Sequence, residues 1–254
     1  MKKYFAHSFF RAPGQENYFK ISRYSIYAGI CFSVFIIAFG LSVLFFWARE
    51  SLGLRLSVFI LILDIILFMV VAKNHEKFIQ GLQGEKMVFY ELMGLIKKGY
   101  DLYASFPGEK FDIDFILVSS KGVFVIEVKN PLKRFPEDKI IYSENKIKIL
   151  HKDGEISIFN RKNPVEQAIS NSAWLEIYLK NLIGKKISFI KPVVLFPGFL
   201  VEEYMSEKIV ILNPKRFESY IESLPDILSE SEINQINVAI KAKLKHIHDE
   251  IWKE

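Results

Sequence analysis

The feature that most constrains the fold of this chain is a pair of apolar segments near its N-terminus. Residues 24–48 carry no charged side chain and are rich in Ile, Phe, Leu and Val. As an α-helix this segment would be about 37 Å long, which is enough to cross a bilayer. A second run, residues 56–72, is interrupted only by Asp64 and reaches spanning length if its helix begins near Leu52. The two runs predict a transmembrane helical hairpin over residues 24–72, with spans at about 24–48 and 52–72.

The charges that flank this hairpin predict its orientation. Basic side chains precede the first span and follow the second, whereas the loop between them holds only Arg49 and Arg55. The positive-inside rule therefore places both termini and the soluble domain in the cytoplasm, with two spans in the cell (inner) membrane and the lipid bilayer as a partner. A cleaved secretory signal is the competing interpretation, but the first run is too long for one and 23 residues precede it.

Asp64 is an acidic residue in the middle of the second span. An ionised carboxylate there costs about 2.5–3.5 kcal/mol. We expect this carboxyl group to be protonated or turned toward a hydroxyl group such as that of Ser33 or Ser42. A functional role, helix pairing and packing of a homo-oligomer through the hairpin all remain open for it.

The distribution of charge removes one argument for nucleic-acid binding. The chain has a sequence pI near 9.0 and a formal net charge of +5. Residues 1–77 hold nine basic and four acidic side chains, so the remaining residues hold 25 of each and are neutral overall. The basic excess thus belongs to the membrane segment, where lipid headgroups and topology explain it. Cys31 is the single cysteine, which excludes a disulfide framework and a thiolate metal site.

The rest of the chain has the pattern of an α/β domain. A helix is expected at 85–98, with Val88, Leu92, Leu95 and Ile96 on one stripe. Further elements are expected as strands near 111–118, 122–129, 139–143, 146–151 and 155–159, a helix at 164–182, strands within FIKPVVLFPG and KIVIL, and helices at 214–223 and 229–252. The expected divisions are a cytoplasmic tail at 1–23, the hairpin at 24–72, an α/β domain at 78–225 and a C-terminal helix at 226–254.

The stretch FDIDFILVSSKGVFVIEVKN predicts a β-hairpin with charged residues at its open end. A two-residue turn at Ser120 and Lys121 pairs positions whose numbers sum to 241, so Asp114 faces Glu127 and Asp112 faces Lys129. All four side chains then share one face of the sheet. Two carboxylates at directly facing positions repel each other unless a proton or a cation lies between them. This arrangement suits Mg²⁺ with a neighbouring amine, and a structural ion pair of Lys129 with Asp112 and Glu127 is the alternative.

Four stretches, in this order and spacing, resemble the nuclease-related domain (NERD) family of the PD-(D/E)xK nuclease superfamily. They are GLQGEKMVFYEL, DIDFILVSSKGVFVIEVKN, NPVEQAISNSAWLEIYL and PVVLFPG, and the resemblance covers about residues 78–225. It implies a restriction-endonuclease-like mixed sheet flanked by helices and a divalent metal, Mg²⁺ or Mn²⁺.

The resemblance also implies roles for five residues of this chain. Asp114 matches the metal-binding aspartate, Glu127 and Lys129 match the acid-x-lysine pair, Glu85 matches the acid of the first helix and Gln167 the glutamine of the following helix. Glu127 and Asp114 would hold the metal, and the others would assist catalysis. One departure is Asn130-Pro131 after the lysine, where the family has a small residue.

Three functional hypotheses follow. The first is a membrane-anchored, metal-dependent nuclease that hydrolyses phosphodiester bonds in DNA or RNA. The second is a catalytically inactive module of the same fold that binds nucleic acid or a protein partner at the membrane. The third is a membrane sensor or scaffold organised by the hairpin and Asp64.

His246 and His248 do not share a helix face and are not expected to bind a metal.

Overall fold

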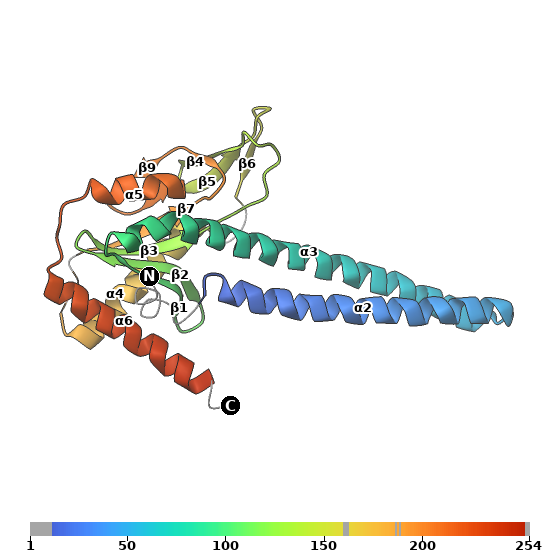
Figure 1. Cartoon of the computed structure of the whole chain (residues 1–254). Helices are drawn as coiled ribbons and strands as arrows, with labels where there is room; N and C mark the ends of the chain where they lie inside the picture. Colours follow the sequence, from blue (N-terminus) through green and yellow to red (C-terminus); the bar gives the residue numbers. More distant parts are fainter. Residues whose placement is uncertain (1–11, 160–162, 186, 188, 252–254) are drawn as a thin grey trace. The chain divides into compact units, whose positions relative to one another are not determined.

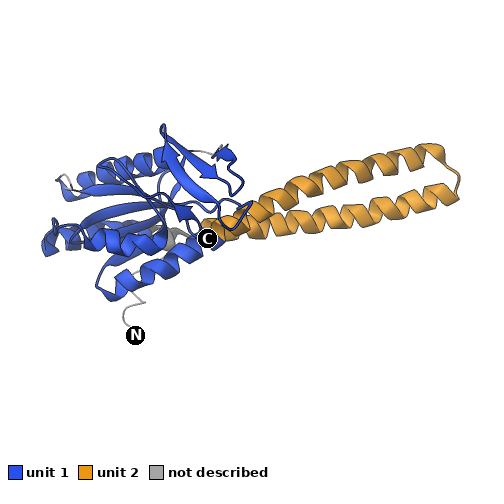
Figure 2. Ribbon diagram, turned by 90° about the horizontal axis from the view of Figure 1, so that it is seen from above, with its two compact units in different colours: residues 1–15, 83–254 blue, residues 16–82 orange. Residues whose placement is uncertain are grey.

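The computed structural model describes residues 12–159, 163–185, 187 and 189–251. The chain forms two compact units, shown in different colours in Figure 2. Residues 16–82 make the first, and residues 83–254 with the short segment before residue 16 make the second. The boundary lies within one helix.

The apolar segments form two long helices, α2 (Gln15–Trp47) and α3 (Ser51–Lys97). Both are long and apolar enough to cross a membrane, by length and composition. Only 11% and 17% of their most apolar windows are buried. A core helix of a water-soluble protein would be mostly buried, so these side chains instead form an extensive exposed apolar surface of the kind that lipid covers.

Both helices are longer than the sequence pattern predicts. α2 begins at Gln15, so residues 15–23 are helical and not an irregular tail. α3 continues without a break to Lys97, and the separate helix expected from Glu85 is its last part. The glycines of GLQGEK do not end the helix, because Gly81 and Gly84 are each packed closely against another side chain there.

Asp64 is 7% exposed, on the inner side of the α2–α3 hairpin. The expected serine partners are wrong. Ser42 donates a hydrogen bond to the hydroxyl oxygen of Ser57 at 2.8 Å, which joins the two helices. Ser33 bonds a carbonyl oxygen of its own helix, as serine does inside an apolar helix. The recorded hydrogen bonds of Ser33 and Ser42 are therefore made to groups other than the Asp64 carboxyl group.

The larger sheet has the strand order β1-β2-β3-β7-β10-β9. Its first three strands are antiparallel, whereas β3, β7 and β10 run parallel, so the expected mixed sheet is confirmed. In sheet order the bounds are β1 (Asp101–Pro107), β2 (Asp112–Ser119), β3 (Gly122–Val128), β7 (Ile190–Leu195), β10 (Val210–Leu212) and β9 (Tyr204–Met205).

A second, four-stranded sheet has the order β6-β5-β4-β8. Its strands are β6 (Ile156–Ile158), β5 (Lys146–Leu150), β4 (Lys139–Ser143) and β8 (Leu200–Val201). The turn between β4 and β5 holds Glu144 and Asn145, both with positive φ, as a two-residue type I′ turn requires.

Helices cover both faces of the larger sheet (Figure 1). On one face, Leu92 of α3 and Phe217 of α5 (Pro214–Glu222) belong to the same buried cluster as the inward side chains of β2 and β3. On the other face, α4 (Pro164–Ile183) contributes Leu175 and α6 (Glu230–Ile251) contributes Ile240. The α/β architecture with a mixed sheet flanked by helices, following two apolar helices, is confirmed.

Strand β1 was not predicted from the sequence. Its residues are buried from Leu102 to Pro107, so they show no alternation of polar and apolar side chains. Ser105 also adopts a positive φ of 49° and is skipped in the pairing with β2. The periodicity of a half-buried strand is absent from such a segment.

Candidate functional site

The site begins where β2 and β3 separate. Their ladder runs from Ser119↔Gly122 to Phe115↔Ile126, which confirms the predicted register over these pairs. Beyond Phe115, β2 continues beside β1 and β3 continues beside β7. The two strands part at the positions of the predicted acids, which leaves an opening between the strand ends.

Asp114 lies in this opening. Its Oδ2 atom accepts a hydrogen bond from the backbone nitrogen of Val128 at 2.7 Å. The carboxylate thus replaces the carbonyl group that a regular ladder would supply, and it holds the end of β3 beside β2. Asp114 and Glu127 follow the last recorded pair of the ladder, and the charges of both carboxylates act on the ammonium group of Lys129.

Glu127 is the most deeply buried member of the group, with 2% of its surface exposed. Its Oε1 atom is paired with the ammonium group of Lys129. Its Oε2 atom lies 3.5 Å from Nδ2 of Asn171, which is 4% exposed. A buried carboxylate needs such partners, because an uncompensated charge in the interior is costly.

Lys129 connects the strand to helix α4. Its Nζ atom lies 3.4 Å from Oε1 of Gln167 and pairs with Glu127. Burial by itself lowers the pKa of this ammonium group, but the charges of Glu127 and Asp114, and more weakly of Glu85, outweigh it, so the pKa is raised. Lys129 is therefore a cation at neutral pH.

Glu85 joins the site from helix α3 and is 7% exposed. The preceding residue explains how the helix comes so close. A Cβ atom at Gly84 would lie 2.6 Å from Cβ of Asn130, the residue that follows Lys129. Only glycine allows this approach of α3 to the end of β3.

Helix α4 presents its two polar side chains to the site from successive turns. The helix begins at an Asn163 cap, whose side chain accepts a hydrogen bond from the nitrogen of Val165, followed by Pro164. Gln167 and Asn171 are four residues apart and so lie on one face. Asn171 and Gly84 were not singled out from the sequence. The four-residue spacing from Gln167 was the available signal for Asn171.

One predicted cross-strand pair lies outside the ladder. Asp112 was expected opposite Lys129, but the β2–β3 ladder ends before that position. The backbone of Asp112 pairs instead with Pro107 of β1. The charges that raise the pKa of Lys129 come from Glu127, Asp114 and Glu85. Lys129 forms an ion pair with Glu127, and a second contact with Asp112 stays a prediction.

The donor set fits a hard divalent cation. Three carboxylates and one ammonium group give a formal net charge of −2, and oxygen atoms are the ligands that Mg²⁺ prefers. No group of three or more His, Cys, Asp or Glu side chains within the described residues is arranged to hold a metal ion. Mg²⁺ usually takes one or two carboxylates with water and substrate phosphate, and Asp114 and Glu127 would supply that number.

Comparison with known proteins finds a family match over the segment that contains this site. Residues 80–197 match the family model described as nuclease-related domain (NERD). The matched range includes all five of the predicted site residues. Among curated proteins and among solved structures, the search gave no significant match.

Proposed function

We propose that the protein hydrolyses phosphodiester bonds in DNA or RNA, with a divalent metal held by Asp114 and Glu127, because residues 80–197 match the nuclease-related domain model. The observation that carries this proposal is the convergence of three carboxylates and one ammonium group at the opening between β2 and β3. Metal-assisted hydrolysis of a phosphodiester uses a negative pocket for the cation, and a positive group beside it can stabilise the phosphate.

The raised pKa of Lys129 defines what this side chain does. A protonated amine cannot accept the proton of the attacking water, so Lys129 does not act as the general base. Its N–H groups donate to the attacking water or to a phosphate oxygen, and its charge offsets the negative charge that develops in the transition state. Gln167 accepts a hydrogen bond from Nζ and so orients the ammonium group.

The carboxylates divide into two roles. Asp114 and Glu127 are the proposed metal ligands, and Mg²⁺ bound there would lower the pKa of a coordinated water and neutralise phosphate charge. Glu85 adds negative potential from α3, and Asn171 holds the second oxygen of Glu127. Both fix the orientation of the carboxylates before substrate arrives.

We further propose that α2 and α3 anchor the protein in the cell membrane with both termini in the cytoplasm. Their exposed apolar surface and the basic residues on the two outer flanks support this arrangement. Nucleic acid of the cytoplasm would then be the substrate.

The test uses the full-length protein in detergent or nanodiscs. It is incubated with single-stranded, double-stranded and branched DNA and RNA, with Mg²⁺, with Mn²⁺ or with EDTA. We expect metal-dependent cleavage that falls at least about 100-fold in Lys129→Ala. Lys139→Ala is the matched control, because Lys139 pairs with the exposed Glu202 on the second sheet.

Two results would contradict the proposal. One is equal cleavage by the wild type and Lys129→Ala. The other is nucleic-acid binding without cleavage of any substrate by a protein whose thermal unfolding shows it to be folded. The second result would favour the catalytically inactive binding module.

A further inference from the structure

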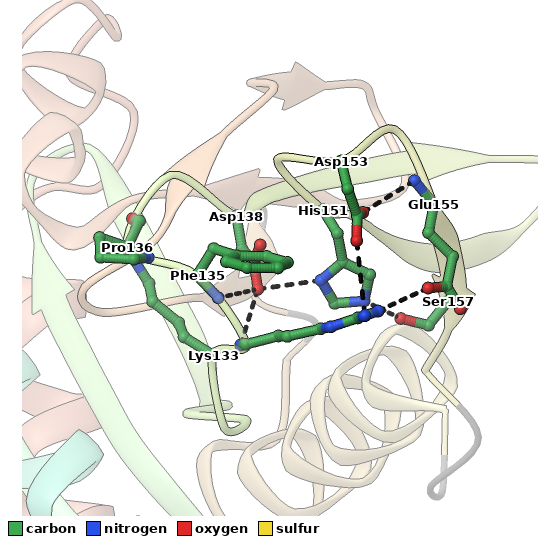
Figure 3. A network of polar contacts seen from close by, with 9 residues as sticks. Lys133, Phe135, Pro136, Asp138, His151, Asp153, Glu155 and Ser157 are labelled. Atoms are coloured by element: carbon green, nitrogen blue, oxygen red, sulfur yellow. Dashed lines mark hydrogen bonds and ion pairs between the residues drawn. The ribbon is translucent and has the colours of Figure 1, made fainter.

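A second cluster of chemically active side chains lies outside the nuclease-like site. It consists of Asp138, His151 and Ser157, all at one end of the four-stranded sheet (Figure 3). Asp138 directly precedes β4, His151 directly follows β5, and Ser157 is the middle residue of β6.

The pleat of the sheet brings these residues to one face. Ser157 pairs with Ile149 of β5, and His151 is two residues after Ile149, so both side chains point the same way. Asp138 is two residues before Ile140, which belongs to the same buried cluster as Ile149. Asp138, His151 and Ser157 therefore meet on one face at this end of the four-stranded sheet.

Asp138 fixes the protonation of the imidazole ring. Its side chain is fully buried, and Oδ2 accepts hydrogen bonds from the backbone nitrogens of Arg134 at 2.8 Å and Phe135 at 3.1 Å. Burial by itself raises the pKa of this carboxyl group, but the two backbone bonds and the contact with His151 outweigh it, so the pKa is lowered. An ionised carboxylate only accepts hydrogen bonds.

The contact with Asp138 determines which nitrogen of His151 faces Ser157 without a proton. Nδ1 of His151 lies 3.0 Å from Oδ2 of Asp138 and must carry the proton of that contact. In the tautomer with its proton on Nδ1, Nε2 holds the lone pair and accepts the hydrogen bond of the Ser157 hydroxyl group. A base within hydrogen-bond reach of a hydroxyl, itself oriented by a third group, is the arrangement that activates a serine nucleophile.

The three residues differ in accessibility. Asp138 is fully buried, whereas His151 and Ser157 are each partly exposed, and Ser157 lies on the edge strand β6.

The surrounding charges select the kind of substrate. Arg134 is paired with Glu155 at 2.5 Å and with Asp153 at 3.5 Å. With Asp138 and Lys133, which belong to the same network (Figure 3), this gives three negative charges against two positive ones. These groups carry no positive excess that would attract a phosphodiester, which separates this cluster from the nuclease-like site.

We propose that Asp138, His151 and Ser157 form a nucleophilic triad that reacts with neutral carboxylic esters. Ser157 Oγ attacks the ester carbon, the Oγ–C bond forms, and the hydroxyl proton moves to Nε2 of His151. The C–O bond to the leaving alcohol then breaks, and the alcohol takes that proton. Water, deprotonated by the same nitrogen, releases the carboxylic acid and restores the serine hydroxyl group.

The first experiment treats the full-length protein in detergent with an alkyl fluorophosphonate. In this reaction the Oγ–P bond forms, fluoride leaves and the proton passes to His151. Intact mass and peptide mapping should show one adduct, on Ser157. Ser143→Ala is the matched control, because Ser143 lies in the same sheet and no histidine of the described part of the chain bonds it. It should label as the wild type does, whereas Ser157→Ala should not label.

Two further variants separate catalysis from structure. His151→Ala should lower the labelling rate about 100-fold, which is the usual contribution of a general base. Asp138→Asn is nearly isosteric and should lower it by about tenfold or more, because the imidazolium formed in the reaction loses its counter-charge. Release of 4-nitrophenol from 4-nitrophenyl acetate should follow the same order of variants.

The proposal is overturned if the folded wild type gives no Ser157 adduct, or if the adduct forms at an unchanged rate in His151→Ala. Thermal unfolding of each variant shows whether it is folded. A variant that does not fold is replaced by His151→Gln or Ser157→Cys, and the latter should react with iodoacetamide faster than Ser143→Cys.

Discussion

The residue that connects most of the nuclease-like site is Lys129. It contacts Glu127 and Gln167, and its pKa responds to the charges of Asp114 and Glu85. It therefore determines both the charge balance of the site and the cost of burying Glu127. Its stability effect can be measured separately from any catalytic effect.

We predict that Lys129→Met destabilises the protein by about 3 kcal/mol at pH 8, because the buried Glu127 carboxylate loses its counter-charge. The loss should be smaller at pH 5 if the carboxylate charge is its cause, because acid favours the neutral carboxyl group. Urea unfolding of the full-length protein at both pH values measures the effect. The double variant Lys129→Met/Glu127→Gln is the control and should recover most of the stability. An equal loss at both pH values would contradict the ion-pair explanation.

The raised pKa of Lys129 also has a consequence for the wild type at high pH. Its contribution to stability is fully present below the unfolded lysine value of about 10.4 and is lost as pH rises through the higher folded value. The difference in unfolding free energy between the wild type and Lys129→Met should therefore decrease in strongly alkaline solution.

At the scale of elements, the approach of α3 to β3 depends on Gly84. We predict that Gly84→Ala destabilises the protein by about 1–3 kcal/mol and lowers cleavage, since the new methyl group would meet Cβ of Asn130 at 2.6 Å. Gly94→Ala in the same helix is the control. Its methyl group would meet only the flexible end of Glu218 at 3.3 Å, so helix propensity should make it neutral or stabilising. Thermal unfolding and cleavage assays compare the two, and equal effects would refute the packing argument.

Helix α6 begins with a capping box. The Ser229 hydroxyl oxygen accepts a hydrogen bond from the nitrogen of Glu232, and Oε2 of Glu232 accepts one from the nitrogen of Ser229. We predict that Ser229→Ala costs about 1 kcal/mol of unfolding free energy. Ser231→Ala is the control, because its position lies inside the helix and not at the cap. A smaller loss for Ser229→Ala than for the control would contradict the capping role.

The same cap gives a pH dependence. The bond from the Ser229 backbone, then that from its hydroxyl group and the contact with Lys185, lower the pKa of Glu232 to about 2. The stabilisation is present above the unfolded value of about 4.3 and is lost as pH falls through about 2. The difference in melting temperature between the wild type and Glu232→Gln should therefore disappear in strong acid. A difference that persists there would show that the ionised Glu232 carboxylate is not its cause.

At the scale of the whole molecule, the testable property is topology. We predict that, in a Cys31→Ser background, Ser51→Cys reacts with a membrane-impermeant maleimide in intact cells, because the proposed topology places the turn between α2 and α3 outside the cytoplasm. Lys208→Cys in the soluble unit should react only after permeabilisation. The reverse pattern would invert the orientation, and recovery of the protein in the soluble fraction would remove the membrane anchor.

Local patterns in the sequence were sufficient for much of this structure. The β2–β3 register followed from a two-residue turn and period-two alternation, and α4 from its Asn-Pro start and 3.6-residue period. The two apolar helices followed from composition and length. These features depend on residues close together in the chain, and so they are readable without coordinates.

The tertiary structure decided which distant side chains meet. The parting of β2 from β3 places Asp114 against Val128 and pairs the backbone of Asp112 with β1, while Gly84 lets α3 bring Glu85 to the strand end. The Asp138–His151–Ser157 cluster requires three strands to end together, and no spacing in the sequence signals it. Contacts of this kind depend on where strands diverge and how closely helices approach. Packing of the whole domain determines both, and local periodicity in the sequence does not encode them.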